Sequence, residues 1–377
     1  MMNNFYKDKK VLITGHTGFK GAWMVQMLTD MGAKVYGYAL PSPTDPALFN
    51  LLKLENKMES EKGDIRDLFH LMTFFKKVQP EIVIHMAAQP IVRTSYQDPV
   101  GTYETNVMGT VNVLECIKQT ASVKSFVNVT TDKVYRNNEW ERGYREEDEL
   151  CGYDPYSNSK SCSELVTDSY RNSFFASLRE LQDINDGNLH SMDNYPAEIS
   201  GKRICAISTC RAGNVIGGGD FAKDRIIPDC FRAVKVGDEI VVRNPHSTRP
   251  YQHVLEPVTA YLKLAMMQYR NPALASAYNI GPGDKDCLTT GSIVNLFCLK
   301  WETLTGEPAS WKNVSLEGPH EANFLKLDCQ KARDKWQWSP VWNIDKAMDM
   351  VVAWYAYLLR GHDLQEITKK QIEEYLA

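Results

Sequence analysis

The chain has 377 residues, of which 43% are hydrophobic and 24% are charged, so it can bury a sizeable core and is not a disordered protein. It carries 43 Lys and Arg against 47 Asp and Glu, and the formal charge of −4 excludes an overall basic field for nucleic acid. No apolar run approaches the ~18 residues of a membrane span, and the polar start does not resemble a signal peptide. We therefore expect a cytoplasmic protein with neither nucleic-acid nor membrane partners.

The positions of cysteine and histidine argue against a metal centre. The nine cysteines form no CxxC pair and no zinc-type cluster with histidine. His85, His246 and His253 have no carboxylate or cysteine partner at the spacing of a metal site. We expect reduced, buried cysteines and no bound metal.

A strand, a glycine-rich turn, a helix and a second strand open the chain. Residues 10–14 are apolar and β-branched, as in a strand buried on both faces. Residues 22–32 have helical apolar spacing, and residues 33–38 predict the next strand. This order, within about 30 residues, is typical of a dinucleotide-binding fold.

The same alternation continues along the chain and predicts an α/β fold, a Rossmann-type doubly wound parallel sheet. The apolar patterns predict further helices and buried strands, the helices at 68–78, 103–119 and 156–181 and the strands at 81–86, 125–129 and 204–209.

Two domains are expected. Residues 1–213 form the cofactor-binding domain, with a polar surface excursion at 182–202. Residues 214–377 have shorter elements separated by turn clusters. They predict a smaller mixed domain that mainly binds substrate, with some segments returning to the Rossmann core.

The glycines of the first turn have three separate tasks. Gly15 makes the tight turn that leaves the strand, Gly18 lets a pyrophosphate approach the backbone, and Gly21 lets the helix pack closely on the sheet. The helix then offers free N–H groups and a positive dipole end to the phosphates. Together with the flanking strands and helix, this turn predicts a nicotinamide dinucleotide cofactor.

The carboxyl ends of the next strands extend the expected cofactor site. Asp64 follows a short predicted strand and can accept the adenine amino group, while Ala87 and Ala88 leave room for a ribose. Near Tyr38 the chain lacks both the usual ribose-binding acid and an arginine, which leaves NAD and NADP open and favours NAD. The remaining expected cofactor contacts are Thr17, Phe19, Lys20, Ile65, Gln89, Asn106 and Thr130, with Tyr156 and Lys160 at the nicotinamide end.

Tyr156 and Lys160 predict the reactive site. At i and i+4 they lie on one face of a helix. A phenol is a poor base at neutral pH, and a neighbouring cation favours its phenolate. This pair can remove a proton from a hydroxyl while a hydride leaves for nicotinamide.

Three motifs resemble the extended short-chain dehydrogenase/reductase superfamily: residues 14–21 (TGHTGFKG), residues 131–135 (TDKVY), and Tyr156 with Lys160. Within it, the chain is similar to the nucleotide-sugar 4,6-dehydratases over nearly its whole length. Lys133 stands where the dTDP-glucose members carry Glu. That departure, with three further segments, looks like the CDP-glucose members of this family; the segments are 211–220, 249–254 and 320–322.

The resemblance implies an internal redox cycle on CDP-glucose that yields the 4-keto-6-deoxy sugar nucleotide for deoxysugar and O-antigen biosynthesis. Tyr156, helped by Lys160 and Thr131, would remove the C4 hydroxyl proton, and Asp132 would protonate the departing C6 hydroxyl. Lys133 is either the C5 base, which requires a neutral amine, or a substrate-orienting or structural cation.

The expected substrate contacts are basic and polar side chains that follow the strands. Guanidinium groups suit a pyrophosphate, although each arginine is as readily explained by a structural ion pair. The candidates are Arg93, Thr131, Arg211, Asn214, Arg225, Arg249 and His253.

Other functions stay open at this point. A nucleotide-sugar epimerase or decarboxylase, or a dehydratase for dTDP-, GDP- or UDP-sugars, would share Tyr156 and Lys160. A non-catalytic binding protein on the same fold would have no need of Thr131, Tyr156 and Lys160 together. The resemblance also implies a homodimer or homotetramer, paired through the helices at 103–119 and 156–170.

Overall fold

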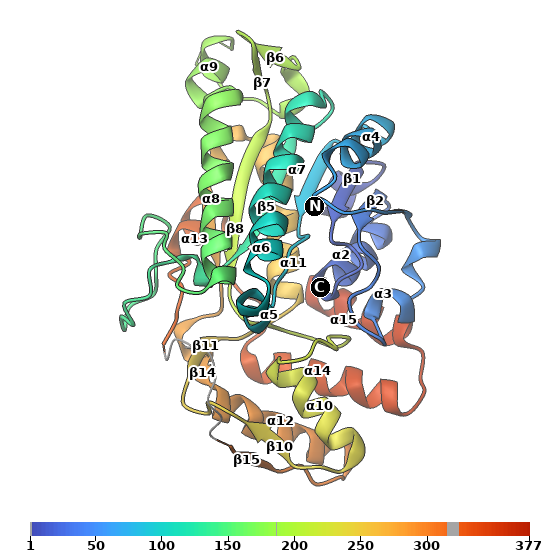
Figure 1. Ribbon diagram of the computed structural model, residues 1–377. Helices are drawn as coiled ribbons and strands as arrows, with labels where there is room; N and C mark the ends of the chain where they lie inside the picture. The colour runs from blue at the N-terminus through green and yellow to red at the C-terminus, as the bar shows by residue number, and fades with distance from the viewer. Residues whose placement is uncertain (1, 186, 315–323) are drawn as a thin grey trace.

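The computed structural model describes residues 2–185, 187–314 and 324–377. Its centre is one seven-stranded sheet whose neighbouring strands are all parallel (Figure 1). In spatial order the strands are β13 (Ala277–Ile280), β8 (Ala206–Ala212), β5 (Ser125–Thr131), β4 (Ile82–His85), β1 (Lys10–Thr14), β2 (Lys34–Ala39) and β3 (Glu59–Lys62).

Helices cover both faces of this sheet, because alternate residues of each strand point to opposite sides. Val11 and Ile13 pack with α2 (Phe19–Asp30) and α11 (Leu255–Arg270) in one apolar cluster. Leu12 packs in a second cluster with α4 (Leu68–Val78) and α7 (Gly109–Gln119). Two cores separated by one parallel sheet confirm the predicted doubly wound Rossmann-type fold.

The helix predicted at 156–181 is shorter than expected. Helix α8 spans Pro155–Phe174, and the chain then bonds to Arg203 through the backbone of Ala176. Ser177 starts a new helix, α9 (Leu178–Asp183), with a capping box formed with Glu180. The Ser177 cap and the extended chain between α8 and α9 explain why the apolar pattern at 156–181 gives two helices instead of one.

The helix predicted at 103–119 begins earlier and changes its winding. It consists of α6 (Pro99–Tyr103), a π-helical turn η2 (Glu104–Met108) and α7. Asp98 caps α6 by accepting a hydrogen bond from the Gly101 amide at 2.9 Å.

The second half of the chain forms a layer below the sheet in Figure 1 and also returns to it. β13 joins the sheet edge, and α11 packs against its core. The lower layer contains α10 (Ile226–Val236), β10 (Ile240–Val242), α12 (Thr290–Thr305), β15 (Trp311–Asn313), α14 (Ile344–Leu359) and α15 (Leu364–Leu376).

Short elements complete the described chain. The strand pairs are β6 (Glu198–Ile199) with β7 (Lys202–Arg203), β9 (Val215–Ile216) with β12 (Gln252–His253), and β11 (Thr248–Pro250) with β14 (Cys287–Thr289). The short helices are α1 (Met2–Tyr6), α3 (Leu48–Leu51), α5 (Val92–Gln97), α13 (Gln330–Trp336), η1 (Leu54–Asn56), η3 (Asp132–Val134), η4 (Met192–Asn194), η5 (Pro272–Leu274) and η6 (Asp284–Asp286).

The described residues of the polar segment 182–202 lie at one end of the molecule, together with the β6–β7 hairpin at the top of Figure 1. Among the described residues, no helix is long and apolar enough to cross a membrane. The motif at 320–322 lies outside the described residues.

Candidate active site

The first glycine turn is built for a close backbone approach. Gly15 has a φ of 77°, and a side-chain carbon there would lie 2.7 Å from the Ala87 amide nitrogen. At Gly21 such a carbon would lie 2.4 Å from the Gly15 carbonyl oxygen. Gly18 is the N-cap of α2 and has no side-chain cap, so the first N–H groups of this helix remain for phosphate oxygens. This turn therefore fits a dinucleotide pyrophosphate.

Beside the turn, two expected cofactor residues are tied to the backbone or to a neighbour. The Thr17 hydroxyl donates to the Leu40 carbonyl at 2.9 Å. The Asp64 carboxylate accepts hydrogen bonds from Arg66, which lower the pKa of that carboxyl. Ile65 is buried, and a side-chain carbon at Gly109 would lie 2.5 Å from it. Asp64, which is expected at the adenine end, is therefore paired with Arg66 and is not a free carboxylate.

A polar network connects the end of β4 with the catalytic helix. The Asn106 amide donates to the Gln89 carbonyl at 3.0 Å and to the Ser159 hydroxyl at 2.9 Å. Its oxygen accepts from the Gln89 amide nitrogen. Ala87 and Ala88 precede this link, and the backbone of Ala87 lies next to Gly15. The network fixes the position of α8 relative to the glycine turn.

Tyr156 and Lys160 lie in the first two turns of α8. Asp154 caps this helix, accepting from the Ser157 amide at 2.9 Å. The Lys160 ammonium is buried and donates to the Val129 carbonyl at 3.1 Å. Burial lowers the pKa of Lys160 to about 8. Burial also raises the pKa of Tyr156 to about 12, against the opposing effect of a hydrogen bond with Thr131.

The end of β5 brings a hydroxyl and a carboxyl to the same place. The Thr131 hydroxyl donates to Asp132 Oδ1 at 3.0 Å, and Asp132 is 2% exposed. Asp132 Oδ2 is buried and has no hydrogen-bond partner among the described residues. Burial raises the pKa of Asp132, although Lys133 and Arg249 oppose this effect. A buried carboxyl of this kind is suited to holding a proton for donation.

Sequence reasoning missed Gly213, which makes room for this carboxyl. A side-chain carbon at Gly213 would lie 3.1 Å from Asp132 Oδ2 and 2.5 Å from a Pro250 ring carbon. The signal available in the sequence was its place directly after the last residue of β8, at the carboxyl edge of the sheet.

Lys20 connects the cofactor turn with the reactive groups. It is the second residue of α2, and its ammonium lies 5.9 Å from the centre of the Tyr261 ring. Burial, Arg225 and Lys160 lower the pKa of Lys20 to about 7, while Asp132 opposes them. The structure thus brings Lys20, Lys160, Asp132 and Arg225 into one electrostatic site. Phe19 lies beside them, against Gly217.

The neighbours of four other expected substrate contacts are as follows. Arg225 forms an ion pair with Asp220 at 3.0 Å and acts electrostatically on Tyr156. Arg249 is buried and donates to the Thr248 carbonyl. The other two are Arg93, whose Nε lies 3.8 Å from Asp224, and Asn214, whose carbonyl accepts from the Gln252 amide.

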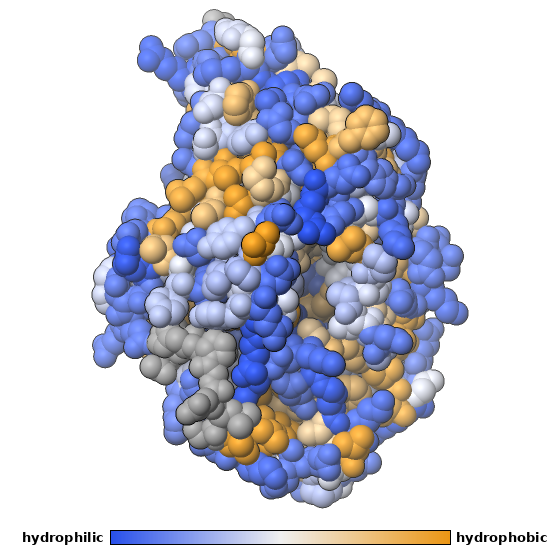
Figure 2. Space-filling view, in the orientation of Figure 1, coloured by the Kyte–Doolittle hydropathy of each residue, from blue (hydrophilic) through white to orange (hydrophobic). Residues whose placement is uncertain are grey.

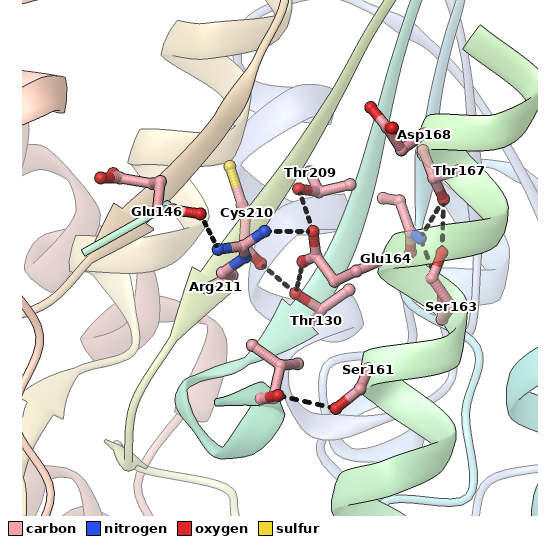
Figure 3. A network of polar contacts seen from close by, with 12 residues as sticks. Thr130, Glu146, Ser161, Ser163, Glu164, Thr167, Asp168, Thr209, Cys210 and Arg211 are labelled. Atoms are coloured by element: carbon pink, nitrogen blue, oxygen red, sulfur yellow. Dashed lines mark hydrogen bonds and ion pairs between the residues drawn. The ribbon is translucent and has the colours of Figure 1, made fainter. Parts of the chain in front are cut away.

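Two of the expected substrate contacts have other partners. Arg211 is buried and donates to Glu164 at 2.9 Å (Figure 3). It also donates to the Tyr135 hydroxyl at 2.8 Å. This guanidinium is therefore used in a structural ion pair beneath the site, which corrects the phosphate-binding expectation for Arg211.

His253 requires the same correction. It is fully buried between the rings of Trp23 and Trp342, at centroid distances of 5.8 and 4.9 Å. Burial lowers the pKa of His253 to about 3, so the ring is a neutral part of the core. His253 is therefore not proposed as a substrate contact.

Known proteins resemble this chain in sequence. A family model described as GDP-mannose 4,6 dehydratase matches residues 12–183. The chain is 46% identical, over 375 residues, to a CDP-glucose 4,6-dehydratase from Salmonella typhimurium. That match covers 99% of this chain and 98% of the Salmonella protein.

Solved structures share the fold of this chain. A UDP-glucose 4-epimerase from Thermotoga maritima, solved with UDP-glucose, has a TM-score of 0.75 at 21% identity, covering 93% of this chain and 99% of that chain. A dTDP-glucose 4,6-dehydratase from Bacillus anthracis, solved with NAD, has a TM-score of 0.72 at 18% identity, covering 95% and 99%. With the full-length relative and the geometry of Thr131, Asp132, Tyr156 and Lys160, the chain belongs to the nucleotide-sugar 4,6-dehydratase family of the extended short-chain dehydrogenases/reductases.

Proposed function

We propose that this protein is an NAD-dependent CDP-glucose 4,6-dehydratase, which converts CDP-glucose to CDP-4-dehydro-6-deoxyglucose. The observation that carries the proposal is the 46% identity with the Salmonella CDP-glucose enzyme over 99% of the chain. The glycine turn, the Tyr156–Lys160 pair and the buried Asp132 supply the groups that such a reaction needs.

The first step is removal of a proton from the C4 hydroxyl. NAD, held through its pyrophosphate at the glycine turn, would supply the acceptor for the C4 hydride and the source of the hydride for C6. Tyr156 takes the hydroxyl proton, and the Lys160 ammonium stabilises the phenolate. The Thr131 hydroxyl, which is hydrogen-bonded to Tyr156, orients the same sugar hydroxyl. Lys160 in turn is held by the Val129 carbonyl.

The second step is elimination of water across C5 and C6. A ketone at C4 acidifies the C5 hydrogen. Asp132 donates its proton to the departing C6 hydroxyl, and its raised pKa favours the protonated form that this role needs. Lys133 follows Asp132 directly in the η3 turn. In its neutral amine form it removes the C5 proton, and it returns this proton to C5 when the hydride reaches C6.

NAD is proposed over NADP. A 2′-phosphate requires a cation near the end of β2, and residues 38–41 (YALP) contain none. The Bacillus anthracis dehydratase was solved with NAD. Arg225, Arg249, Arg93 and Asn214 are proposed to bind the sugar nucleotide, with Arg225 and Arg249 nearest the reacting groups.

The substrate assignment is tested with the purified protein. The protein is incubated with CDP-, dTDP-, GDP- or UDP-glucose, and the 4-keto product is followed by its absorbance in alkali. We expect turnover of CDP-glucose well above the other three. Turnover of another nucleotide sugar without CDP-glucose turnover would contradict the substrate assignment.

An epimerase is the second candidate, since the solved structures include a UDP-glucose 4-epimerase. Epimerisation at C4 needs Tyr156 and Lys160 but no acid for a C6 hydroxyl. The buried carboxyl of Asp132 therefore favours dehydration. Mass spectrometry of the product separates the two, because only dehydration removes a water.

We also propose that a second copy of the chain covers one apolar face, giving a homodimer or a homotetramer. This α6–α8 face consists of Val100 on α6, Met108 on η2 and Leu165 on α8, which are 67%, 52% and 55% exposed. Figure 2 shows hydrophobic residues gathered on this side, in the region where Figure 1 places α6, α7 and α8. A cytoplasmic location and a role in deoxysugar and O-antigen synthesis are proposed with the substrate.

A further inference from the structure

Glu164 lies beneath the reactive pair and takes no part in the proposed proton transfers. It follows Lys160 by one helical turn on α8 and is 3% exposed. Its carboxylate accepts hydrogen bonds from Thr130, from Thr209 at 2.6 Å and from Arg211 at 2.9 Å (Figure 3). One buried carboxylate thus joins α8 to two strands, β5 and β8.

The ion pair of Glu164 with Arg211 reaches both ends of the catalytic segment 131–133. Thr130 precedes the segment and donates to Glu164. Tyr135 follows the segment, and its hydroxyl accepts from Arg211 at 2.8 Å and donates to Asn279 at 2.7 Å. Because the two flanking residues are bound to the two halves of one buried pair, the segment between them is held in one geometry.

Glu164 comes four residues after Lys160 on α8, which puts the two side chains on the same face of the helix. Lys160 interacts electrostatically with Lys20 on α2, His85 on β4 and Glu164 on its own helix. Glu164 is the acid among them and raises the pKa of Lys160, against the dominant effect of burial. Burial also keeps His85 neutral, by lowering its pKa to about 3.

We propose that Glu164 and Arg211 are positioning residues of this enzyme: Glu164 keeps the Lys160 ammonium charged, and the ion pair fixes segment 131–133 from both sides. The inference rests on the proposed function through the use of Tyr156 and Lys160 in proton removal at C4.

The charge role is tested without substrate. Full-length protein with isotope-labelled lysine is titrated by NMR, and the Lys160 signal is assigned with a Lys160→Met variant. E164Q should lower the pKa of Lys160 by about one unit, since an opposite charge at close range is lost. E164D keeps the charge and should keep that pKa. An unchanged pKa in E164Q would overturn the charge role.

A matched control lies one turn further along α8. Thr167 is buried and accepts a hydrogen bond from Asn128 at 2.9 Å, but it bears no charge and does not contact segment 131–133. T167V should leave the titration of Lys160 unchanged. If T167V shifted it as much as E164Q does, the effect would be general loosening of α8, and the proposal would be wrong.

The positioning role is tested by Tyr135→Phe, which removes the hydrogen bonds of this hydroxyl with Arg211 and Asn279 and keeps the ion pair. We expect kcat on CDP-glucose to fall about fivefold, as for the loss of buried hydrogen bonds, with KM and the alkaline limb of the pH profile unchanged. In E164Q that limb should instead move to lower pH. An unchanged kcat in Y135F would overturn this role. If the wild type fails to turn over CDP-glucose, the proposed function is wrong, while the lysine titration still decides the charge role.

Discussion

Burial of the Asp132 carboxyl lowers the stability of the folded protein, and the proposed role of this carboxyl as a proton donor explains that cost. Its Oδ2 is buried without a partner among the described residues, and burial raises the pKa of the carboxyl. A folded state with the raised pKa holds the proton more tightly than the unfolded chain does. The stability of the protein therefore falls as the pH rises through the carboxyl's titration and stays lower above it.

Replacing Asp132 by Asn should accordingly separate activity from stability. We expect D132N to unfold at a higher temperature than the wild type at neutral pH, with the difference vanishing below the pKa of an unfolded Asp carboxyl, near pH 4. Turnover should fall about 10²- to 10⁴-fold, as for loss of a general acid. Calorimetry and product assays check this. A variant that is both inactive and less stable at neutral pH would contradict it.

The proposed role of Lys133 as the base at C5 is tested by measuring two partial reactions of the same enzyme. If Lys133 removes the C5 proton, Lys133→Ala should slow exchange of the C5 hydrogen with solvent far more than it slows reduction of the bound nicotinamide. Exchange is followed by mass spectrometry in heavy water and reduction by absorbance. Lys133→Arg keeps the charge and serves as the control for a purely orienting cation. An equal loss of both rates in Lys133→Ala would refute the base role.

Sequence reasoning worked at the residue scale where a motif sets geometry locally. The i, i+4 spacing placed Tyr156 and Lys160 on one helix face, and Thr131 ends its strand as predicted, with Asp132 opening the η3 turn. It could not separate a phosphate-binding arginine from a paired one. Arg211 has its partner 47 residues earlier, in Glu164, and only the tertiary fold brings the two together.

At the scale of elements, the glycine turn depends on a contact that no larger residue permits. A side-chain carbon at Gly21 would lie 2.4 Å from the Gly15 carbonyl oxygen, which is backbone and cannot turn away. Gly21→Ala should therefore displace α2 from the sheet and weaken dinucleotide binding at least about tenfold, or about 1.4 kcal/mol. Titration calorimetry with NAD measures this.

The matched control is Gly283→Ala, because a side-chain carbon there meets no atom within 4 Å and the residue has no positive φ. Its affinity for NAD should equal that of the wild type. Unchanged affinity in Gly21→Ala would show that the cofactor does not bind along this turn.

Strand positions were more predictable than helix ends. Each central strand is an apolar run between turn signals, because both of its faces are buried beneath helices. The end of α8 at Phe174 depends instead on Arg203, which binds the following backbone from a distant part of the sequence. The π-turn η2 likewise has no signal in apolar spacing.

At the scale of the whole molecule, the proposed domains share one folding unit. β13 and α11 come from the second half of the chain, yet β13 completes the sheet and α11 packs with Val127 and Val129 of β5. The site is shared as well. Lys20 of the first half and Arg225 of the second act on each other, and a hollow is visible near the middle of the face shown in Figure 2. The expected boundary near 213 therefore does not separate two independent cores.

The exposed α6–α8 face predicts that copies of the chain associate with one another. Leu165 is 55% exposed on α8, and a second copy of the chain would bury it. Leu165→Glu should place a charge in that interface and convert the oligomer to a monomer, measured by light scattering at matched concentration. Leu299→Glu on α12 is the control, since Leu299 is 60% exposed outside this face. A monomeric wild type, or an unchanged mass for Leu165→Glu, would mean that another surface, or none, joins two copies.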